Sequence, residues 1–247
     1  AAGGIPRLIE RADLRGILHM HTEWSDGTPT IEAYALRALE LGVEYIAITD
    51  HSQAASYAGG LTPDDLARQA DEIDAVNARV KGVTVLKGIE VDILADGLLD
   101  LPDAVLKRLD VVIASIHSHF TLSEKEMTKR IARAFENPHL DIFAHPTGRL
   151  LLSREGYAVD LDGVFEAARR HGVAIEVNAH GRRLDLDWRH MRRAREFGLR
   201  FSIDPDAHRL DGLDDLPYGI GIARKGWLTK EDVLTTRPLA EFRRLLR

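Results

Sequence analysis

The sequence predicts an α/β fold, a distorted seven-stranded (βα)7 barrel in which strands and helices alternate. Seven short apolar runs alternate with segments of helical periodicity, and no long polar linker separates them. Six of the seven apolar runs end in His, Asp or Glu where the next loop begins. α/β barrels carry their active sites at this face, whereas an open doubly wound sheet uses a single crevice. The length of 247 residues suits one such domain.

The first predicted strand opens the stretch GILHMHTEWSDG, residues 16–27. Because side chains alternate along a strand, Ile17, His19 and His21 should share one face. The two imidazoles would then lie about 7 Å apart, near enough for one metal ion. Asp26 follows in a turn beside Gly27 and can fold its carboxylate over the same end. A His-x-His pair alone is a weak signal, and two partly buried histidines without a ligand are the alternative.

The remaining elements follow from the same periodicities. The other predicted strands are 43–49, 83–93, 111–116, 140–144, 173–178 and 199–203. The predicted helices are 29–41, 62–80, 101–108, 123–135, 160–171 and 187–197, with weaker helical patterns at 213–225 and 238–246. Thr28 or Thr30 caps the first helix, the motif TPDD at 62–65 has the cap, proline and acids of a helix start, and Ser123 with Glu126 forms a possible capping box.

Composition excludes several classes of protein. With 33 Lys+Arg against 39 Asp+Glu the net charge is -6, which argues against a generic nucleic-acid coat. The absence of cysteine excludes disulfides and thiolate metal ligands. No apolar run reaches the roughly 20 residues that cross a bilayer. We therefore expect a cytoplasmic protein with no membrane partner. Residues 1–12 are linker-like and lack an initial Met, so 1–247 is expected to be one domain of a longer protein.

Polar residues at the predicted strand ends form a candidate metal site. Six imidazoles and three carboxylates without sulfur suit zinc, manganese or iron, and they are too rich in nitrogen for magnesium or calcium. Nine ligands exceed the needs of one ion, so two or three ions sharing a bridging carboxylate fit better. The alternative is that these residues merely cap barrel loops. Nine such residues at matching strand ends argue against that alternative. The candidate ligands are His19, His21, Asp26, His51, Glu90, His117, His145, Asp206 and His208.

Other polar residues near the strand ends are expected to support this site or bind substrate. Asp50, Asp92 and Glu176 can orient imidazoles, with simple burial in a satisfied hydrogen bond as the equal alternative. Four arginines follow the fifth and sixth strands, where guanidinium groups would hold phosphate oxygens in pairs. His119 lies in the loop after the fourth strand and is as well explained by substrate contact as by metal ligation. The expected substrate-binding residues are Arg149, Arg154, Arg182, Arg183 and His119.

The motifs at these positions resemble those of the polymerase and histidinol phosphatase (PHP) superfamily. The matching segments are HMH at 19–21, SDG at 25–27, TDH at 49–51, GIE at 88–90, SIHS at 115–118, HP at 145–146 and DAH at 206–208. More narrowly, LKGIEVDIL, VIASIHS, AHPTGRLL, RLDL and RKGWL resemble the C-terminal PHP domain of bacterial family X DNA polymerases. The similarity runs from Pro6 to the end. One departure is VNAHG at 177–181, where a proline is expected before RLDL.

The resemblance implies a TIM-like barrel holding three divalent ions, Mn²⁺ or Zn²⁺ with iron as a further option. By this analogy the first ion takes His19, His21, Glu90 and Asp206, the second takes Glu90, His117 and His145, and the third takes Asp26, His51 and His208. Since all nine positions carry usable ligands, the non-catalytic form of the domain is disfavoured. The residues expected to act in catalysis are Glu90, His145, Asp206 and His208.

The resemblance also implies a substrate and partners. The expected activity is Mn-dependent 3'-5' exonuclease action on DNA 3' ends, single-stranded or gapped, with related activities at abasic sites and 3' phosphates. N-terminal polymerase domains are the expected partners in the full-length bacterial protein, and the chain itself is expected to be a monomer. The alternatives are a small-molecule phosphatase of histidinol-phosphatase type, an amidohydrolase, and a structural or docking module of a polymerase.

Overall fold

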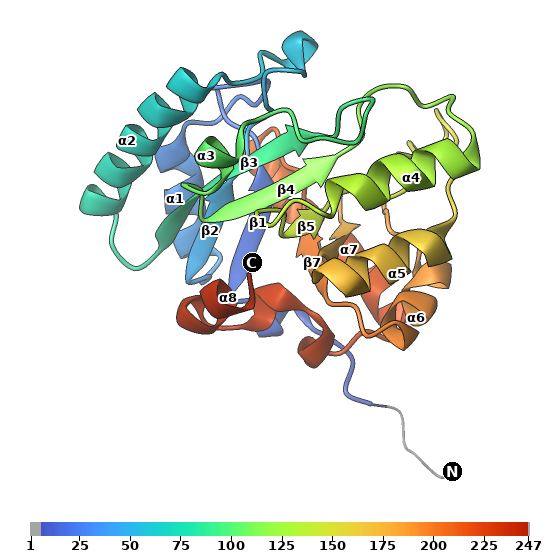
Figure 1. The fold of residues 1–247 in the computed structure, drawn as a ribbon. Helices are drawn as coiled ribbons and strands as arrows, with labels where there is room; N and C mark the ends of the chain where they lie inside the picture. Colours follow the sequence, from blue (N-terminus) through green and yellow to red (C-terminus); the bar gives the residue numbers. More distant parts are fainter. Residues whose placement is uncertain (1–5, 247) are drawn as a thin grey trace.

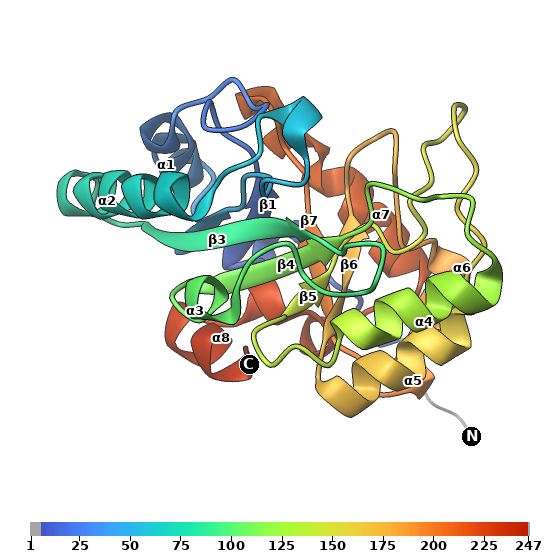
Figure 2. The ribbon, with the colours of Figure 1, turned by 45° about the horizontal axis from the view of Figure 1, so that its top comes forward.

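Seven parallel strands form the centre of the structure, a computed structural model that describes residues 6–246. The strands pair in sequence order, which confirms the predicted barrel (Figures 1 and 2). Between the first and last strands the contact is an isolated bridge from Met20 to Ala207 and a hydrogen bond from the Leu18 N–H to the Asp204 carboxylate. The strands are β1 Gly16–Met20, β2 Tyr45–Ile48, β3 Thr84–Asp92, β4 Val111–Ser115, β5 Ile142–Phe143, β6 Ala174–Asn178 and β7 Phe201–Asp204.

Helices follow the strands around the outside of the barrel, at the positions that the periodicities predict (Figure 1). The weaker pattern at 213–225 becomes two elements, because a 3-10 turn at Leu210–Asp215 precedes the helix. The third predicted helix shortens to a single turn. The helices are α1 Ile31–Glu40, α2 Pro63–Arg79, α3 Asp103–Leu106, α4 Glu124–Ala134, α5 Leu161–His171, α6 Trp188–Glu196, α7 Leu216–Lys225 and α8 Leu239–Leu245.

The predicted helix starts are present as hydrogen-bonded caps. Of the two candidate residues for α1, Thr30 is the cap, and its hydroxyl accepts from the Ala33 N–H at 3.1 Å. Thr62 and Ser123 each begin a reciprocal capping box, with the acidic residue three positions later. These caps fix where α1, α2 and α4 begin, and thereby where the loops from the preceding strands end.

The start of the chain differs from the expected linker. Residues 1–5 lie outside the described residues, so that part of the expectation stays untested. Ile9, however, is fully buried, and its N–H donates to the carbonyl of Leu228 at 3.0 Å. The 3-10 turn at Arg11–Asp13 then leads directly into β1. The packed domain therefore begins before residue 12, and the linker-like stretch is shorter than the sequence indicates.

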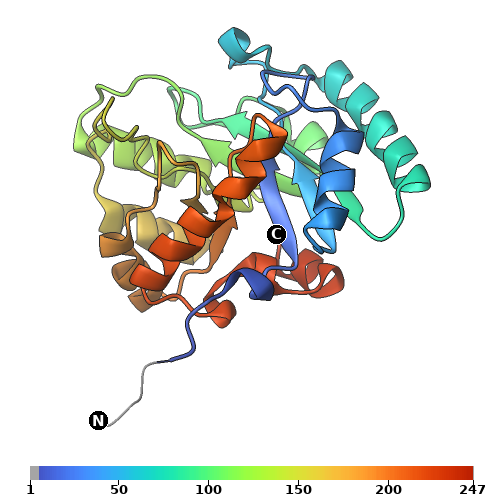
Figure 3. The same ribbon diagram turned by 180° about the vertical axis from the view of Figure 1, so that it is seen from behind.

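The C-terminal helix α8 closes the bottom of the barrel, at the amino ends of the strands (Figures 1 and 3). The ring of Phe242 is fully buried and stacks on Tyr45, with centroids 4.8 Å apart. Phe242 and Tyr45 belong to an apolar cluster with Leu18 and Ile113 from inside the barrel. Gly16 is required here, because a Cβ at this position would lie 2.0 Å from the Tyr45 ring. The lower half of the barrel is therefore a filled apolar core.

None of the helices between residues 6 and 246 combines the length and apolar character needed to span a membrane.

Truncating the buried Phe242 side chain of α8 should destabilise the whole domain. We expect Phe242→Ala to lower the free energy of unfolding by about 3–5 kcal/mol, because a fully buried ring is replaced by a cavity. Urea denaturation followed by circular dichroism measures this change. The control is Leu36→Ala, whose side chain is 50% exposed, and it should change stability by less than about 0.5 kcal/mol. Equal effects of the two substitutions would show that α8 does not close the core.

Candidate metal centre

The nine predicted ligands lie at one end of the barrel, opposite α8. Glu90 comes from β3 and His19 from β1, while the others begin the loops that follow the strands. Ligand atoms within 4.8 Å of one another form four overlapping groups. The groups are His21-Asp26-His51-His208, His19-His145-Asp206, His19-His21-Glu90 and His51-Glu90-His117. The structure thus brings all nine candidates together from positions as distant as 19 and 208.

Glu90 lies at the centre of this cluster. Its carboxylate is buried and has five imidazoles within 4 Å. One oxygen, Oε1, is 2.9 Å from Nε2 of His145, and the other, Oε2, is 2.9 Å from Nδ1 of His51. Because its two oxygens face different imidazoles, Glu90 has the arrangement of a bridging carboxylate.

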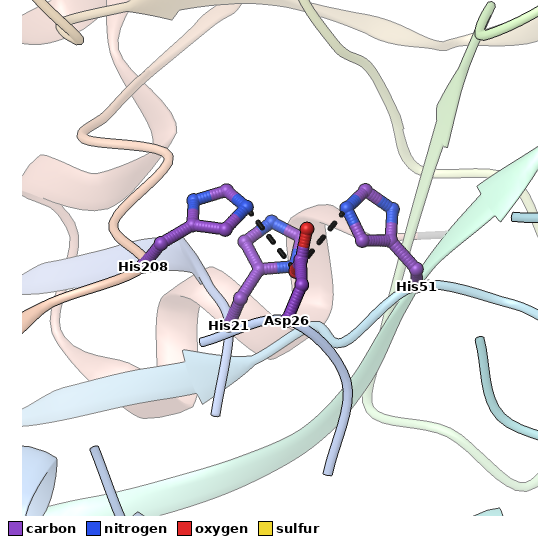
Figure 4. A group of neighbouring side chains, drawn as sticks. All are labelled: His21, Asp26, His51 and His208. Atoms are coloured by element: carbon purple, nitrogen blue, oxygen red, sulfur yellow. Dashed lines mark ion pairs between the residues drawn. The ribbon is translucent and has the colours of Figure 1, made fainter. Parts of the chain in front are cut away.

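Asp26 organises a second, more open group (Figure 4). Its Oδ1 lies 3.3 Å from Nε2 of His208, 3.6 Å from Nε2 of His51 and 3.8 Å from Nδ1 of His21. The Asp26 and His208 side chains are each 35% exposed, unlike the buried Glu90. This group therefore forms the part of the cluster that faces solvent.

Three of the nine residues adopt a left-handed backbone that is unfavourable for side chains other than glycine. The φ angles are 55° at His19, 28° at His145 and 51° at Asp206. At His19 this conformation interrupts the register of β1 against β2 between Ile17 and Met20. The regular alternation expected for this strand is therefore wrong, and the His19 and His21 ring centroids lie 5.3 Å apart, closer than predicted. Such strain is found at functional sites, where the surrounding fold enforces it.

Several buried polar atoms of the cluster have no hydrogen-bond partner, although buried polar groups in proteins are ordinarily paired. They include Nε2 of His19, both ring nitrogens of His21, Nδ1 of His145 and Oε2 of Glu90. These are nitrogen and carboxylate donors directed into one small space. The donor set therefore fits divalent ions of the zinc, manganese or iron type.

Electrostatics hold two imidazoles and two carboxylates in the forms that bind cations, whereas neighbouring carboxylates raise the pKa of His19 and His51, and that of His208 to about 9. Burial lowers the pKa of His21 to about 3 and, with Arg183 nearby, that of His145 to about 4. Both imidazoles are therefore neutral at pH 7. Burial by itself would raise the pKa of Glu90 and Asp206, but neighbouring imidazoles, joined at Asp206 by the Arg183 guanidinium, outweigh it and hold both values well below the ordinary range. Both carboxylates are ionised.

Carboxylates outside the nine orient two of the imidazoles, as predicted for Glu176 and Asp92. Nδ1 of His19 pairs with Glu176, and Nδ1 of His117 lies 2.5 Å from Oδ1 of Asp92. Each contact directs Nε2 of the same ring toward Glu90. Glu176 also accepts the His145 backbone N–H at 2.7 Å, so it holds two members of the cluster.

For Asp50 the alternative of burial with satisfied hydrogen bonds holds, since its carboxylate contacts the groups of a neighbouring turn and of α2 in place of an imidazole. Its carboxylate accepts hydrogen bonds from the backbone and hydroxyl of Thr22, from the Ser25 hydroxyl and from the Gln69 amide, at 2.5–2.7 Å. Asp50 therefore fixes the turn that carries Asp26. Sequence reasoning missed these donors to Asp50. It also missed Asn178, whose amide donates to both Glu176 and Asp206. The available signal was that Asn178 is the polar residue at the one predicted strand end that lacks His, Asp and Glu.

Of the four predicted phosphate-binding arginines, Arg183 is the one that contacts the cluster. Its Nε forms an ion pair with Oδ2 of Asp206 at 2.9 Å, and its side chain is 18% exposed. Arg149 is instead occupied by Asp187 at 2.7 Å and by the backbone carbonyls of residues 183 and 184. Arg154 donates to the Gly148 carbonyl and packs over Phe120. Arg182 is exposed to solvent. The structure therefore gives Arg149 and Arg154 structural contacts in place of free guanidinium groups.

Removing the charge of Asp92 should weaken metal binding without unfolding the protein. Asp92→Asn loses the carboxylate that orients His117, so we expect affinity for Mn²⁺ or Zn²⁺ to fall about 10- to 100-fold. Competition with a chromophoric chelator measures the affinity. Asp71→Asn on the exposed side of α2 is the control and should bind as the wild type does. Unchanged affinity in Asp92→Asn would contradict the orienting role.

Comparisons with known proteins agree with this geometry. The PHP domain model matches residues 18–180. The DNA polymerase/3'-5' exonuclease PolX of Bacillus subtilis (strain 168) is 47% identical over 240 residues, which make up 97% of this chain and 42% of that protein. The chain thus spans less than half the length of this relative. A protein of Thermoanaerobacter sp. (strain X514) named "Probable phosphatase" is 30% identical over 88% of this chain and 89% of its own length.

Among solved structures, histidinol phosphate phosphatase from Lactococcus lactis subsp. lactis, complexed with zinc, L-histidinol and phosphate, matches with a TM-score of 0.61 at 14% identity. The match covers 87% of this chain and 94% of that one, and at this identity it shows the shared fold. The family model covers about two thirds of this chain and ends at residue 180, while the two sequence relatives extend the similarity beyond it. The chain belongs to the PHP domain family of metal-dependent phosphoesterases.

Proposed function

We propose that this phosphoesterase is a 3'-5' exonuclease that hydrolyses DNA with the help of three divalent ions. The observation that carries the proposal is the buried Glu90 carboxylate, whose two oxygens face separate imidazoles that have unpaired nitrogens. The similarity to a relative named as a DNA polymerase and 3'-5' exonuclease, over nearly the whole of this chain, supports DNA as the substrate.

The three-ion assignment follows the resemblance to the PHP superfamily, and the closeness of the nine side chains supports it. We place His19, His21, Glu90 and Asp206 around the first ion and Glu90, His117 and His145 around the second. The third takes Asp26, His51 and His208, and the proximity of these three side chains to one another supports it. Manganese or zinc is the proposed metal, with iron as a further option, because imidazole-rich sites with carboxylates suit these ions.

Bound divalent ions would supply Lewis acidity, lowering the pKa of water and neutralising the charge of phosphoryl oxygens. The protein's part is to hold its donors in place and to bind the phosphate. Among the residues we place in catalysis, Glu90 joins the two buried groups, while Asp206 holds Arg183 at the edge of the cluster. His208 and Asp26 lie on the exposed side, where substrate enters. The Arg183 guanidinium can then turn from Asp206 to a phosphoryl oxygen.

Charge balance explains how an acidic chain would attract DNA. The nine residues include three carboxylates, so three divalent ions would leave the site about three charges positive. This local charge opposes the overall charge of -6 and would steer a phosphodiester to the mouth of the barrel. Arg182 and His119, both exposed near the mouth, remain proposed contacts to substrate.

In this proposal residues 1–247 form one domain, which acts as a monomer in the bacterial cytoplasm beside polymerase domains of a longer protein. The coverage of 42% of the PolX relative supports additional domains in proteins of that type. A small-molecule phosphatase is the second candidate function. The 30% identity to a protein named as a phosphatase, over 89% of its length, favours that alternative.

The two functions separate in one assay. We expect the chain with Mn²⁺ to digest 3'-labelled single-stranded DNA at least 100-fold faster than it hydrolyses histidinol phosphate or another small phosphomonoester, at matched concentrations. Abasic DNA and DNA ending in a 3' phosphate, assayed in parallel, rank the related activities. Faster turnover of the small phosphomonoester would reject the exonuclease in favour of the phosphatase.

Removing the central carboxylate should abolish activity through loss of metal. We expect Glu90→Ala to lose at least one ion per chain by elemental analysis, and to cut DNA at least 100-fold more slowly, because the imidazoles lose their shared partner. Glu136→Ala, at an exposed glutamate after α4, is the control and should keep full metal content and activity. Retained activity in Glu90→Ala would rule out the bridging role.

Arg183 should contribute to binding of the phosphate. We expect Arg183→Ala to raise the KM for DNA about tenfold, since a charged hydrogen bond to phosphate is lost. Steady-state kinetics on the labelled oligonucleotide measures the change. Arg192→Ala removes a side chain that is 83% exposed on α6 and should leave KM unchanged. An equal KM in both variants would show that Arg183 serves only Asp206.

A further inference from the structure

The loop that follows β2 presents an aromatic ring beside the metal cluster. Tyr57, in the 3-10 turn Ser56–Ala58, is 72% exposed. Its ring centroid lies 6.5 Å from the imidazole centroids of His51 and His117. Single exposed aromatic residues are common on protein surfaces and need no explanation by themselves. The position of this ring, next to two candidate ligands and open to solvent, gives it a possible partner in the substrate.

Hydrogen bonds at its base hold this loop in place. The Leu61 N–H donates to the His51 carbonyl at 2.7 Å, and the Ala54 N–H donates to the Asp100 carboxylate at 2.6 Å. Gly60 packs so closely that a Cβ there would lie 1.9 Å from the Ser52 carbonyl oxygen. The Tyr57 ring is therefore presented by a well-anchored loop, which reduces the entropy lost when a ligand packs against it.

An open cavity of about 570 Å³ adjoins the ring. Its lining includes Tyr57, Leu94, Ala95, His117 and His119. The volume falls in the range of about 300–1,000 Å³ that is usual for small-molecule sites. Since His117 belongs both to this cavity and to the metal cluster, a group in the cavity would lie next to a phosphate at the cluster.

Arg130 links two segments that contribute lining residues to the cavity. This buried side chain donates from Nε to the Leu94 carbonyl and from Nη1 to the Ser118 carbonyl, both at 2.8 Å. It also donates to the carbonyl of Ile93. Because one rigid guanidinium fixes segments 93–94 and 118 together, the space between them is formed before any ligand binds.

The chemistry of the lining selects the kind of group that fits. Asp92 and Asp96 also line the cavity, and their carboxylates would repel a phosphate but accept hydrogen bonds from amino groups. The Tyr57 ring and the apolar Leu94 side chain suit a flat, partly apolar group. A nucleobase has both properties, a stacking face and polar edges, and proteins that hold single strands stack bases on aromatic residues.

We propose that this cavity is the subsite for a base flanking the scissile phosphodiester, and that this base stacks on Tyr57. The inference rests on the proposed nuclease function and deepens it. It makes Tyr57 a positioning residue: the ring holds the nucleotide while the cluster acts on the phosphate.

The test compares one DNA strand with and without its terminal bases. The substrates are a single-stranded 12-mer and the same strand with its last two nucleosides replaced by abasic tetrahydrofuran residues. We expect Tyr57→Ala to lower kcat/KM about tenfold on the normal strand, mainly through KM, and to leave the abasic strand unchanged. Tyr57→Phe keeps the ring and should behave as the wild type on both. Tyr218→Ala, at an exposed tyrosine of α7 that does not line the cavity, is the matched control.

The outcomes separate the two levels of the proposal. Suppose that the wild-type protein cuts DNA. If Tyr57→Ala then slows cleavage of the normal and abasic strands equally, or slows cleavage of neither strand, the base subsite is wrong and the nuclease function stands. If wild-type protein cuts neither strand, the proposed function fails and the subsite fails with it. Metal content of Tyr57→Ala, measured by elemental analysis, should equal that of the wild type, and a loss would show that Tyr57 supports the cluster instead.

Discussion

The burial of the Glu90 carboxylate is the interaction on which the rest of the site depends. An ionised carboxylate in a protein interior is costly unless charged or hydrogen-bonding groups surround it. Five imidazoles surround this one, from four other strand ends. Those rings need orientation in turn, which Glu176 supplies to His19 and Asp92 to His117. One buried charge therefore accounts for two successive layers of polar residues at the carboxyl ends of the strands.

The barrel divides this polar cluster from the apolar core that stabilises it. At the amino ends of the strands, α8 inserts Phe242 against Tyr45 and fills the interior. At the opposite end, His19, His145 and Asp206 adopt left-handed backbone conformations. Such conformations cost about 1–3 kcal/mol each, and they persist where the surrounding structure enforces them. The regular ladders from β2 to β7 and the filled lower core supply that enforcement.

The arginines show how a charged residue type can mislead when its partners are unknown. Four of them follow strands on the side of the site, and phosphate binding is a sound expectation for each. In the structure Arg149 pairs with Asp187 and donates to two backbone carbonyls. Arg154 donates to the Gly148 carbonyl and packs over the ring of Phe120. Arg183 alone of these four contacts the cluster, through Asp206. For Asp50 the sequence left two roles open, and the structure selects burial with satisfied hydrogen bonds, which fix the turn that carries Asp26.

The sequence by itself determined the order of strands and helices, the caps at Thr62 and Ser123, and the nine polar residues at the site. These features are local: apolar periodicity sets each element, and the carboxyl ends of parallel strands meet at one face. Only the tertiary structure decided which five imidazoles surround Glu90, the partners of Asp50 and the arginines, the left-handed turn at His19 and the cavity beside Tyr57. Each of these depends on distances between residues far apart in the chain, such as Glu90 and His145, and no local pattern encodes those distances.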